Sequence, residues 1–171
     1  KEVDLLRPPT VRSLLTHTSG LSYDFLEDYP VAELYRQAGI LNNAERTLEE
    51  MVNELSRLPL AFQPDSNWHY SLGIDVAARL IEIISGQALE QFLKENIFDP
   101  LGMVDTGFSV APEEQHRIAA MYGLPDLCSP KMTMSKLFEA WSSGFNERID
   151  VSATYPASKS AAFARGGHGL F

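Results

Sequence analysis

The sequence predicts a mainly α-helical chain, because helical periodicity is strong and strand alternation is poor until near the end of the sequence. Apolar residues recur at helical spacing after Gly73, and Gly86 marks the end of that segment. Their shared face carries Val76, Leu80, Ile81 and Ile84. A capping box, Thr47-Leu-Glu-Glu50, begins a second periodic segment. The apolar face of that segment carries Leu48, Met51, Val52 and Leu55.

Two shorter helices are predicted earlier in the chain. The first begins after Thr10, which is a good N-cap, and Gly20 ends that segment. The second covers residues 30–38, with Pro30 in its first turn and Gly39 after its end. Proline is tolerated in a first turn because the amide that it lacks would have no helical partner there.

After Gly86, the pattern predicts one more helix and then a short one. Leu89, Phe92 and Leu93 point inward in the first of these, which ends near residues 99–102. The short helix is predicted around residues 132–141. Otherwise, residues 126–166 are rich in serine, proline and other polar residues, so we expect loop there.

Composition and charge restrict the classes of function. The chain has 171 residues, of which 44% are hydrophobic and 22% charged, as is ordinary for one globular domain. Its net charge of -9 disfavours nucleic acid, whose phosphates require clustered lysine and arginine. No apolar run approaches the ~20 residues that a membrane-spanning helix needs. We expect neither a nucleic-acid partner nor a membrane segment.

Motifs of several common hydrolases are absent. There is no Gly-x-Ser-x-Gly elbow, no His-Glu-x-x-His pair, and no serine with a lysine three positions later. Thr133-Met-Ser-Lys136 has that last spacing but offers a secondary alcohol, and we interpret it as a capped surface helix.

Histidine, cysteine and glycine positions indicate no metal or cofactor. The histidines are too far apart in sequence to suggest a metal site, so we interpret them as surface or hydrogen-bonding residues. They are His17, His69, His116 and His168. The single cysteine, Cys128, excludes an internal disulfide and is interpreted as an inert filler. Gly166-Gly-His-Gly lacks the strand and helix that flank a dinucleotide loop, and is interpreted as a tight turn.

Four sequence blocks together resemble the serine β-lactamase-related family, which groups class C β-lactamases, D-alanyl-D-alanine carboxypeptidases and related esterases. In chain order, the blocks are Leu14-Leu-Thr-His-Thr-Ser-Gly-Leu21, Tyr70-Ser-Leu-Gly-Ile-Asp-Val-Ala77, Pro100-Leu-Gly-Met-Val-Asp-Thr-Gly-Phe108 and Ala164-Arg-Gly-Gly-His-Gly-Leu170. Each block alone is modest evidence, but four in the family's order make the resemblance specific.

The resemblance implies a mixed α/β domain and a mostly helical domain, with the active site in the crevice between them. The family's Ser-x-x-Lys helix precedes the first block, and its Lys-Thr-Gly-like strand follows the last. We therefore expect this chain to be an internal fragment. Residues 1–125 would be the mostly helical domain, and residues 126–171 a loop-rich segment leading back to the α/β domain. The absence of an initiator methionine and the apolar last residues fit this expectation.

Tyr70 matches the catalytic tyrosine of the family, and the resemblance implies that it transfers protons to and from a nucleophilic serine. Ser19 is not that nucleophile, and we expect it to have a structural role. Taken without the resemblance, Tyr70 is better interpreted as a packing aromatic residue whose hydroxyl caps a neighbouring group.

Leu72 departs from the family pattern, because β-lactamases and carboxypeptidases usually have an asparagine there and leucine has no polar group. Tyr-Ser-Leu instead resembles the esterase branch. We therefore predict an enzyme that cleaves small carboxylic esters through an acyl-serine. The alternatives are a class C β-lactamase or carboxypeptidase acting on β-lactam-like substrates, and a non-catalytic binding homologue.

The expected truncation has two consequences. This chain by itself should be inactive, because no nucleophile accompanies Tyr70. The apolar face through Val76 and Ile84 should be uncovered, which favours self-association unless further segments cover it. The sequence does not indicate a cellular compartment.

Overall fold

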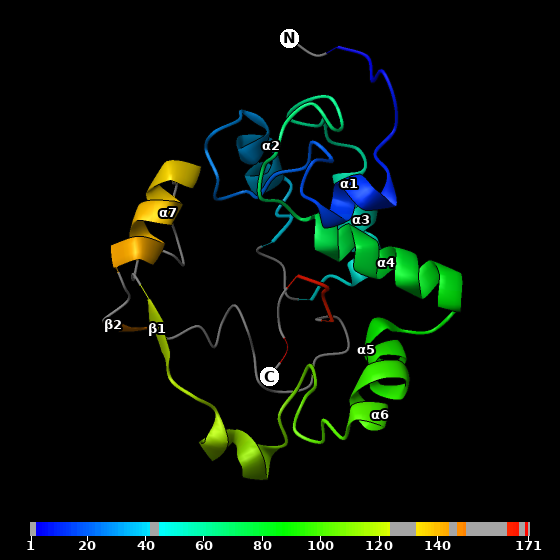
Figure 1. Ribbon diagram of the computed structural model, residues 1–171, viewed down its shortest axis with the longest axis vertical. Coiled ribbons are helices and arrows are strands. Elements are labelled where there is room, and N and C mark those ends of the chain that lie inside the picture. Colours follow the sequence, from blue (N-terminus) through cyan, green and yellow to red (C-terminus); the bar gives the residue numbers. More distant parts are fainter. Residues whose placement is uncertain are drawn as a thin grey trace.

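The computed structural model describes residues 3–41, 45–123, 133–143, 147–149, 164–167 and 170. They form mainly short helices, as predicted (Figure 1). The α-helices are α1 (Val11–Leu15), α2 (Val31–Gln37), α3 (Leu48–Leu55), α4 (Gly73–Ser85), α5 (Leu89–Leu93), α6 (Asp99–Leu101) and α7 (Met134–Ser143). A π-helical turn, η1 (Lys94–Phe98), joins α5 to α6, and a 3-10 helix, η2 (Pro112–Arg117), follows.

A short antiparallel pair of strands corrects the loop prediction for three of the residues in 126–166, those of the second strand. β1 (Met121–Gly123) pairs with β2 (Glu147–Ile149), so that Met121 lies opposite Ile149. A strand of three residues is too short for alternation to be visible in the sequence. The helix predicted around 132–141 is α7, although residue 132 lies outside the described residues.

The first helix ends earlier than predicted. Thr10 caps α1 as expected, since its hydroxyl oxygen accepts a hydrogen bond from the amide of Ser13 at 3.1 Å. However, α1 ends at Leu15, because the backbone of His17 turns into the left-handed region with a φ of 55°. Gly20 therefore lies in a loop beyond the helix.

The predicted capping box of α3 is confirmed. The hydroxyl oxygen of Thr47 accepts from the amide of Glu50 at 3.2 Å, and the carboxylate of Glu50 accepts from the amide of Thr47 at 2.9 Å. Three of the four predicted apolar residues of this helix are buried, and Val52 is half-buried. The buried ones are Leu48, Met51 and Leu55. The prediction for residues 30–38 is also confirmed, since α2 follows Pro30.

The long helix α4 is confirmed, with Gly86 in the left-handed conformation at its end. Its predicted apolar face is correct only in part. The side chains of Val76, Leu80 and Ile81 are half-buried against the core. Ile84 is 83% exposed, because α4 extends past α1 and α3 (Figure 1). The most buried positions are instead small or polar: Gly73, Asp75 and Ala78.

The helix predicted after Gly86 is also confirmed and ends at Gly102, in left-handed conformation. It is continuous from α5 through η1 to α6, with a wider turn in the middle. That turn ends two residues before Pro100, whose ring would clash with the carbonyl four residues earlier in a regular helix.

One hydrophobic core joins these elements. The start of α4 packs on α1, and α4 also contacts α3 and α5. The buried core residues are Leu14, Leu21, Tyr23, Leu26, Val31, Tyr35, Ile40, Leu48, Met51, Leu55, Leu72, Ala78, Leu89, Phe108 and Leu137. In the described part of the chain, every helix is too short or too polar to cross a bilayer.

Residues 166 and 167, from the last sequence block, pack tightly on the first turns of α4. The amide of Gly167 donates a hydrogen bond to the carboxylate of Asp75 at 3.1 Å, and both Asp75 and Arg165 are buried. Burial raises the pKa of the Asp75 carboxyl, while the Gly167 amide and the Arg165 guanidinium lower it. A Cβ atom on Gly166 would lie 2.5 Å from the carbonyl oxygen of Ile74. The glycine therefore permits the close contact.

We predict that Gly166→Ala lowers the free energy of unfolding by about 1–3 kcal/mol, the usual cost of overpacking a core. The added methyl group would overlap with α4, including the Cβ of Ala78 at 2.6 Å. Urea unfolding measures the change. Gly107→Ala is the matched control, since its new Cβ would lie 3.7 Å from its nearest neighbour, the carbonyl oxygen of Ser109. Equal midpoints for the two variants would contradict this packing.

Candidate active site

Two loops meet at the start of α4: residues 16–23, the His17 loop, and residues 60–72, the Tyr70 loop. Backbone amides of the Tyr70 loop donate to carbonyl oxygens of the His17 loop. These pairs are Ala61 to Gly20, Asp65 to Thr18 and His69 to His17, at 2.7, 2.7 and 2.9 Å. A side chain at Gly20 would overlap with the carbonyl of Phe62, and one at Gly73 with that of Leu14. The loops therefore touch backbone to backbone.

Tyr70 is half-buried where the two loops meet. Its ring contacts those of His17 and Tyr23, at centroid distances of 4.9 and 5.0 Å. Tyr23 is buried and stacks on Phe25 at 5.0 Å. Within the part of the chain that the structure describes, the Tyr70 hydroxyl makes no hydrogen bond. The ring is thus held by two aromatic contacts while its hydroxyl keeps its capacity to donate and accept.

Both sequence neighbours of Tyr70 are hydrogen-bonded to the His17 loop. The Oγ of Ser71 shares a hydrogen bond with Nδ1 of His17 at 3.2 Å. The Nε2 of His69 shares one with the Oγ of Ser22 at 2.9 Å. Ser22, His69 and Ser71 are all buried. We call these contacts the two Ser–His pairs.

The hydrogen bonds of Ser22 indicate where the proton lies in the pair of Ser22 and His69. Its hydroxyl is within 3.2 Å of the carbonyl oxygen of Tyr23, which can only accept. When Ser22 donates its single proton to this carbonyl, its oxygen accepts from His69, whose Nε2 then carries the proton.

The two histidines are held in their neutral form. Burial lowers the pKa of the His17 imidazole. Burial also lowers the pKa of His69, and this outweighs the carboxylate of Asp28, which raises it. A neutral imidazole can donate with one ring nitrogen and accept with the other, which is compatible with both Ser–His pairs.

Unlike Tyr70, Leu72 is a packing residue. Its side chain is completely buried and belongs to the hydrophobic core. It precedes α4 and forms no side-chain cap. The third position of the Tyr-Ser-Leu block therefore contributes packing rather than a polar group.

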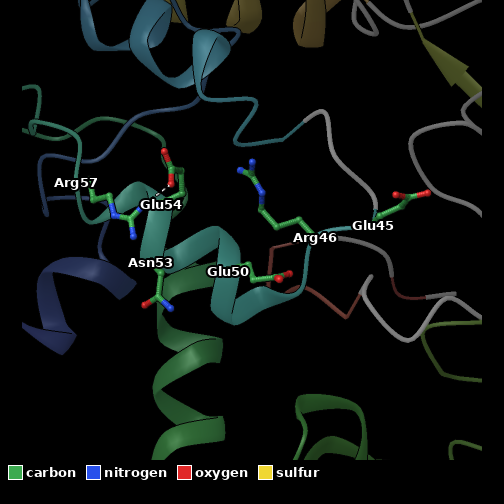
Figure 2. A pocket seen from close by; sticks show the side chains of 6 residues that line it. All are labelled: Glu45, Arg46, Glu50, Asn53, Glu54 and Arg57. Carbon is green, nitrogen blue, oxygen red and sulfur yellow. Dashed lines mark hydrogen bonds and ion pairs between the residues drawn. The ribbon is translucent and has the colours of Figure 1, made fainter.

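A surface hollow of about 490 Å3 lies along α3, apart from these loops (Figure 2). It is lined by Glu45, Arg46, Glu50, Asn53, Glu54 and Arg57. Arg57 pairs with Glu54 at 2.9 Å, and Arg46 donates to the carbonyl oxygens of Ala38 and Gly39. Ligand pockets for small organic molecules are mostly apolar, so this charged hollow is not the predicted site.

Other predicted residues are placed as follows. Thr133 caps α7, since its hydroxyl oxygen accepts from the amide of Lys136 at 3.4 Å, and Lys136 is exposed. Ser19 is buried in the turn after α1, where its hydroxyl oxygen accepts from the amide of Leu21. His116 is exposed and bonded to the carbonyl of Glu113.

Cys128 and His168 lie outside the described residues. The described residues contain no cluster of metal-ligating side chains.

The interpretation of the histidines as hydrogen-bonding or surface residues is correct for His17 and His69. The contact of the His17 ring with Tyr70 and the hydrogen bond of His69 to Ser22 were not predicted. A signal was present, because each histidine lies inside or directly before a block that carries the family resemblance.

Comparison with known proteins supports the resemblance. Lovastatin esterase from Penicillium rubens is 40% identical over 111 residues, which are 65% of this chain and 27% of that protein. Esterase EstB from Burkholderia gladioli is 37% identical over 120 residues, or 68% of this chain and 30% of that protein. The chain thus spans less than a third of these curated relatives.

A solved structure has the same fold. EstCE1, a hydrolase with promiscuous acyltransferase activity, superimposes with a TM-score of 0.69 at 27% identity, over 96% of this chain and 43% of that chain. The family model described as Beta-lactamase matches residues 5–166, which is most of the chain. This chain therefore belongs to the serine β-lactamase-like family.

Proposed function

We propose that this chain is part of a serine hydrolase that cleaves small carboxylic esters through an acyl-serine intermediate, with Tyr70 as the proton-transfer residue. The observation that carries the proposal is the arrangement of Tyr70, whose ring contacts two other aromatic rings while its hydroxyl makes no hydrogen bond among the described residues.

The chemistry assigns a definite task to this phenol. A nucleophilic serine must lose its proton during attack, and the leaving alcohol must gain one. A free phenol has a pKa near ~10, so neighbouring positive charges are needed to make it an effective base at neutral pH. In the family pattern, these charges come from lysines outside this chain.

Two observations support esters over β-lactams. The relatives described above are named as esterases. In addition, Leu72 is buried in the core, so position 72 offers no amide to a substrate. A β-lactamase or carboxypeptidase is therefore the weaker candidate.

Acyl transfer is a second candidate, because EstCE1 is described as having promiscuous acyltransferase activity. Hydrolysis and acyl transfer share the acyl-serine intermediate and differ only in whether water or an alcohol accepts the acyl group. An active site that excludes water favours the alcohol.

We also propose the domain assignment expected from the family. Residues 1–125 form the mostly helical domain, and residues 126–171 lead back to an α/β domain elsewhere in the whole protein. A non-catalytic binding homologue is the alternative. A whole protein without a Ser-x-x-Lys pair before Leu14 would favour that alternative.

We predict that the whole protein cleaves a short p-nitrophenyl ester and turns over a chromogenic cephalosporin weakly or not at all. In the same assay, Tyr70→Phe should lower ester turnover by about 10²–10⁴-fold, the usual contribution of general acid–base catalysis.

Tyr122→Phe is the matched control, because this tyrosine is 54% exposed on β1. It should leave ester turnover unchanged. Brisk cephalosporin turnover without ester cleavage would overturn the esterase assignment. Full activity of Tyr70→Phe would exclude the assigned role of the phenol.

The 171-residue chain alone should have no esterase activity, since its sequence contains no Ser-x-x-Lys pair to provide the nucleophile. Release of p-nitrophenol above the uncatalysed rate is the measurement. Activity of the chain that disappears in Tyr70→Phe would contradict this prediction and indicate a different nucleophile.

We further predict that the isolated chain self-associates through the end of α4. Ile83 and Ile84 are adjacent there and are 61% and 83% exposed. Light scattering should give a mass above that of one chain, and Ile83→Ser with Ile84→Ser should lower it. A monomeric wild-type chain would contradict the prediction.

A further inference from the structure

Each of the two Ser–His pairs includes one sequence neighbour of Tyr70. His69 is bonded to Ser22, and Ser71 to His17, so both neighbours of the tyrosine are tied to the same loop. A backbone hydrogen bond from the amide of His69 to the carbonyl of His17, at 2.9 Å, adds a third connection. The backbone around Tyr70 is therefore fixed on each side of the residue.

His17 contacts both the ring of Tyr70 and the residue that follows Tyr70. Its Nδ1 is bonded to Ser71, and its ring contacts the Tyr70 ring at 4.9 Å with an interplanar angle of 57°. The second ring contact of Tyr70 is with Tyr23, the residue that follows Ser22. In one Ser–His pair, His17 itself contacts the phenol ring. In the other, Ser22 directly precedes Tyr23, which makes the second ring contact.

The backbone of His17 is itself unusual. Its φ of 55° lies in the left-handed region, where a residue with a side chain is less stable than glycine. Such conformations persist only where the surrounding structure enforces them, and they gather at functional sites. Here, the residue with this conformation is the one whose ring contacts Tyr70 and whose Nδ1 is hydrogen-bonded to Ser71.

We propose that Ser71 and Ser22, through His17 and His69, are positioning residues that hold the Tyr70 phenol in the orientation needed for proton transfer. The proposal rests on the function proposed above, because it assigns these residues to the same reaction. None of the four is proposed to contact the substrate.

Ser71→Ala and Ser22→Ala in the whole protein test this proposal. We expect kcat for the p-nitrophenyl ester to fall at least about tenfold while KM changes less than about twofold. Misplacing a proton-transfer group weakens transition-state stabilisation without removing a substrate contact. A general loss of folded protein would instead lower the amount of active enzyme, which active-site titration measures separately.

Ser19→Ala is the matched control. Ser19 is as buried as Ser71 and lies in the same loop as Ser22, but its hydroxyl oxygen accepts from the amide of Leu21. This variant should keep kcat within about twofold. Equal losses of kcat in all three alanine variants would overturn the positioning role, as would unchanged kcat in Ser71→Ala and Ser22→Ala.

Combining Ser71→Ala with Tyr70→Phe separates this proposal from the proposed function. If Ser71 acts through the phenol, the double variant should be no slower than Tyr70→Phe alone. An additional loss in the double variant would overturn the positioning role. Full activity of Tyr70→Phe would instead refute the function of Tyr70 itself.

His17→Asn keeps the test decisive if the alanine variants do not fold. Asparagine accepts the left-handed backbone better than most residues, but it lacks the ring that contacts Tyr70. We expect the same loss of kcat with little change in KM. A fully active His17→Asn enzyme would overturn the proposal.

Discussion

The backbone-to-backbone contact between the His17 loop and the Tyr70 loop is the constraint on which the described site depends. Gly20 and Gly73 have no room for a side chain, because the carbonyls of Phe62 and Leu14 lie where a Cβ would be. This contact brings α1 against the start of α4 and places His17 beside Tyr70. The hydrophobic core supplies stability, but these two glycines allow the approach that assembles the site.

The sequence predicted the features that depend on local interactions. The capping box at Thr47 and Glu50 involves residues three positions apart, and Gly86 ends α4 through its own backbone conformation. The Tyr70 block was also identified from sequence, through a resemblance rather than through periodicity.

Features that depend on distant partners were not predictable. Nothing near His17 in the sequence shows that its ring contacts Tyr70, which is more than fifty positions away. Likewise, the burial of Asp75 and the exposure of Ile84 depend on what packs on each part of α4. The periodic pattern describes the helix itself, whereas its partners decide which face is covered.

The contact between Asp75 and Gly167 joins residues 92 positions apart in the chain. Long-range contacts form late in folding, because the loop between them must close before they add stability. We therefore expect α1, α3 and α4 to assemble before residues 166 and 167 pack on α4. During synthesis on the ribosome, the carboxylate of Asp75 would lack the amide of Gly167 until that residue had emerged, so the packing on the first turns of α4 would be completed only at this late step.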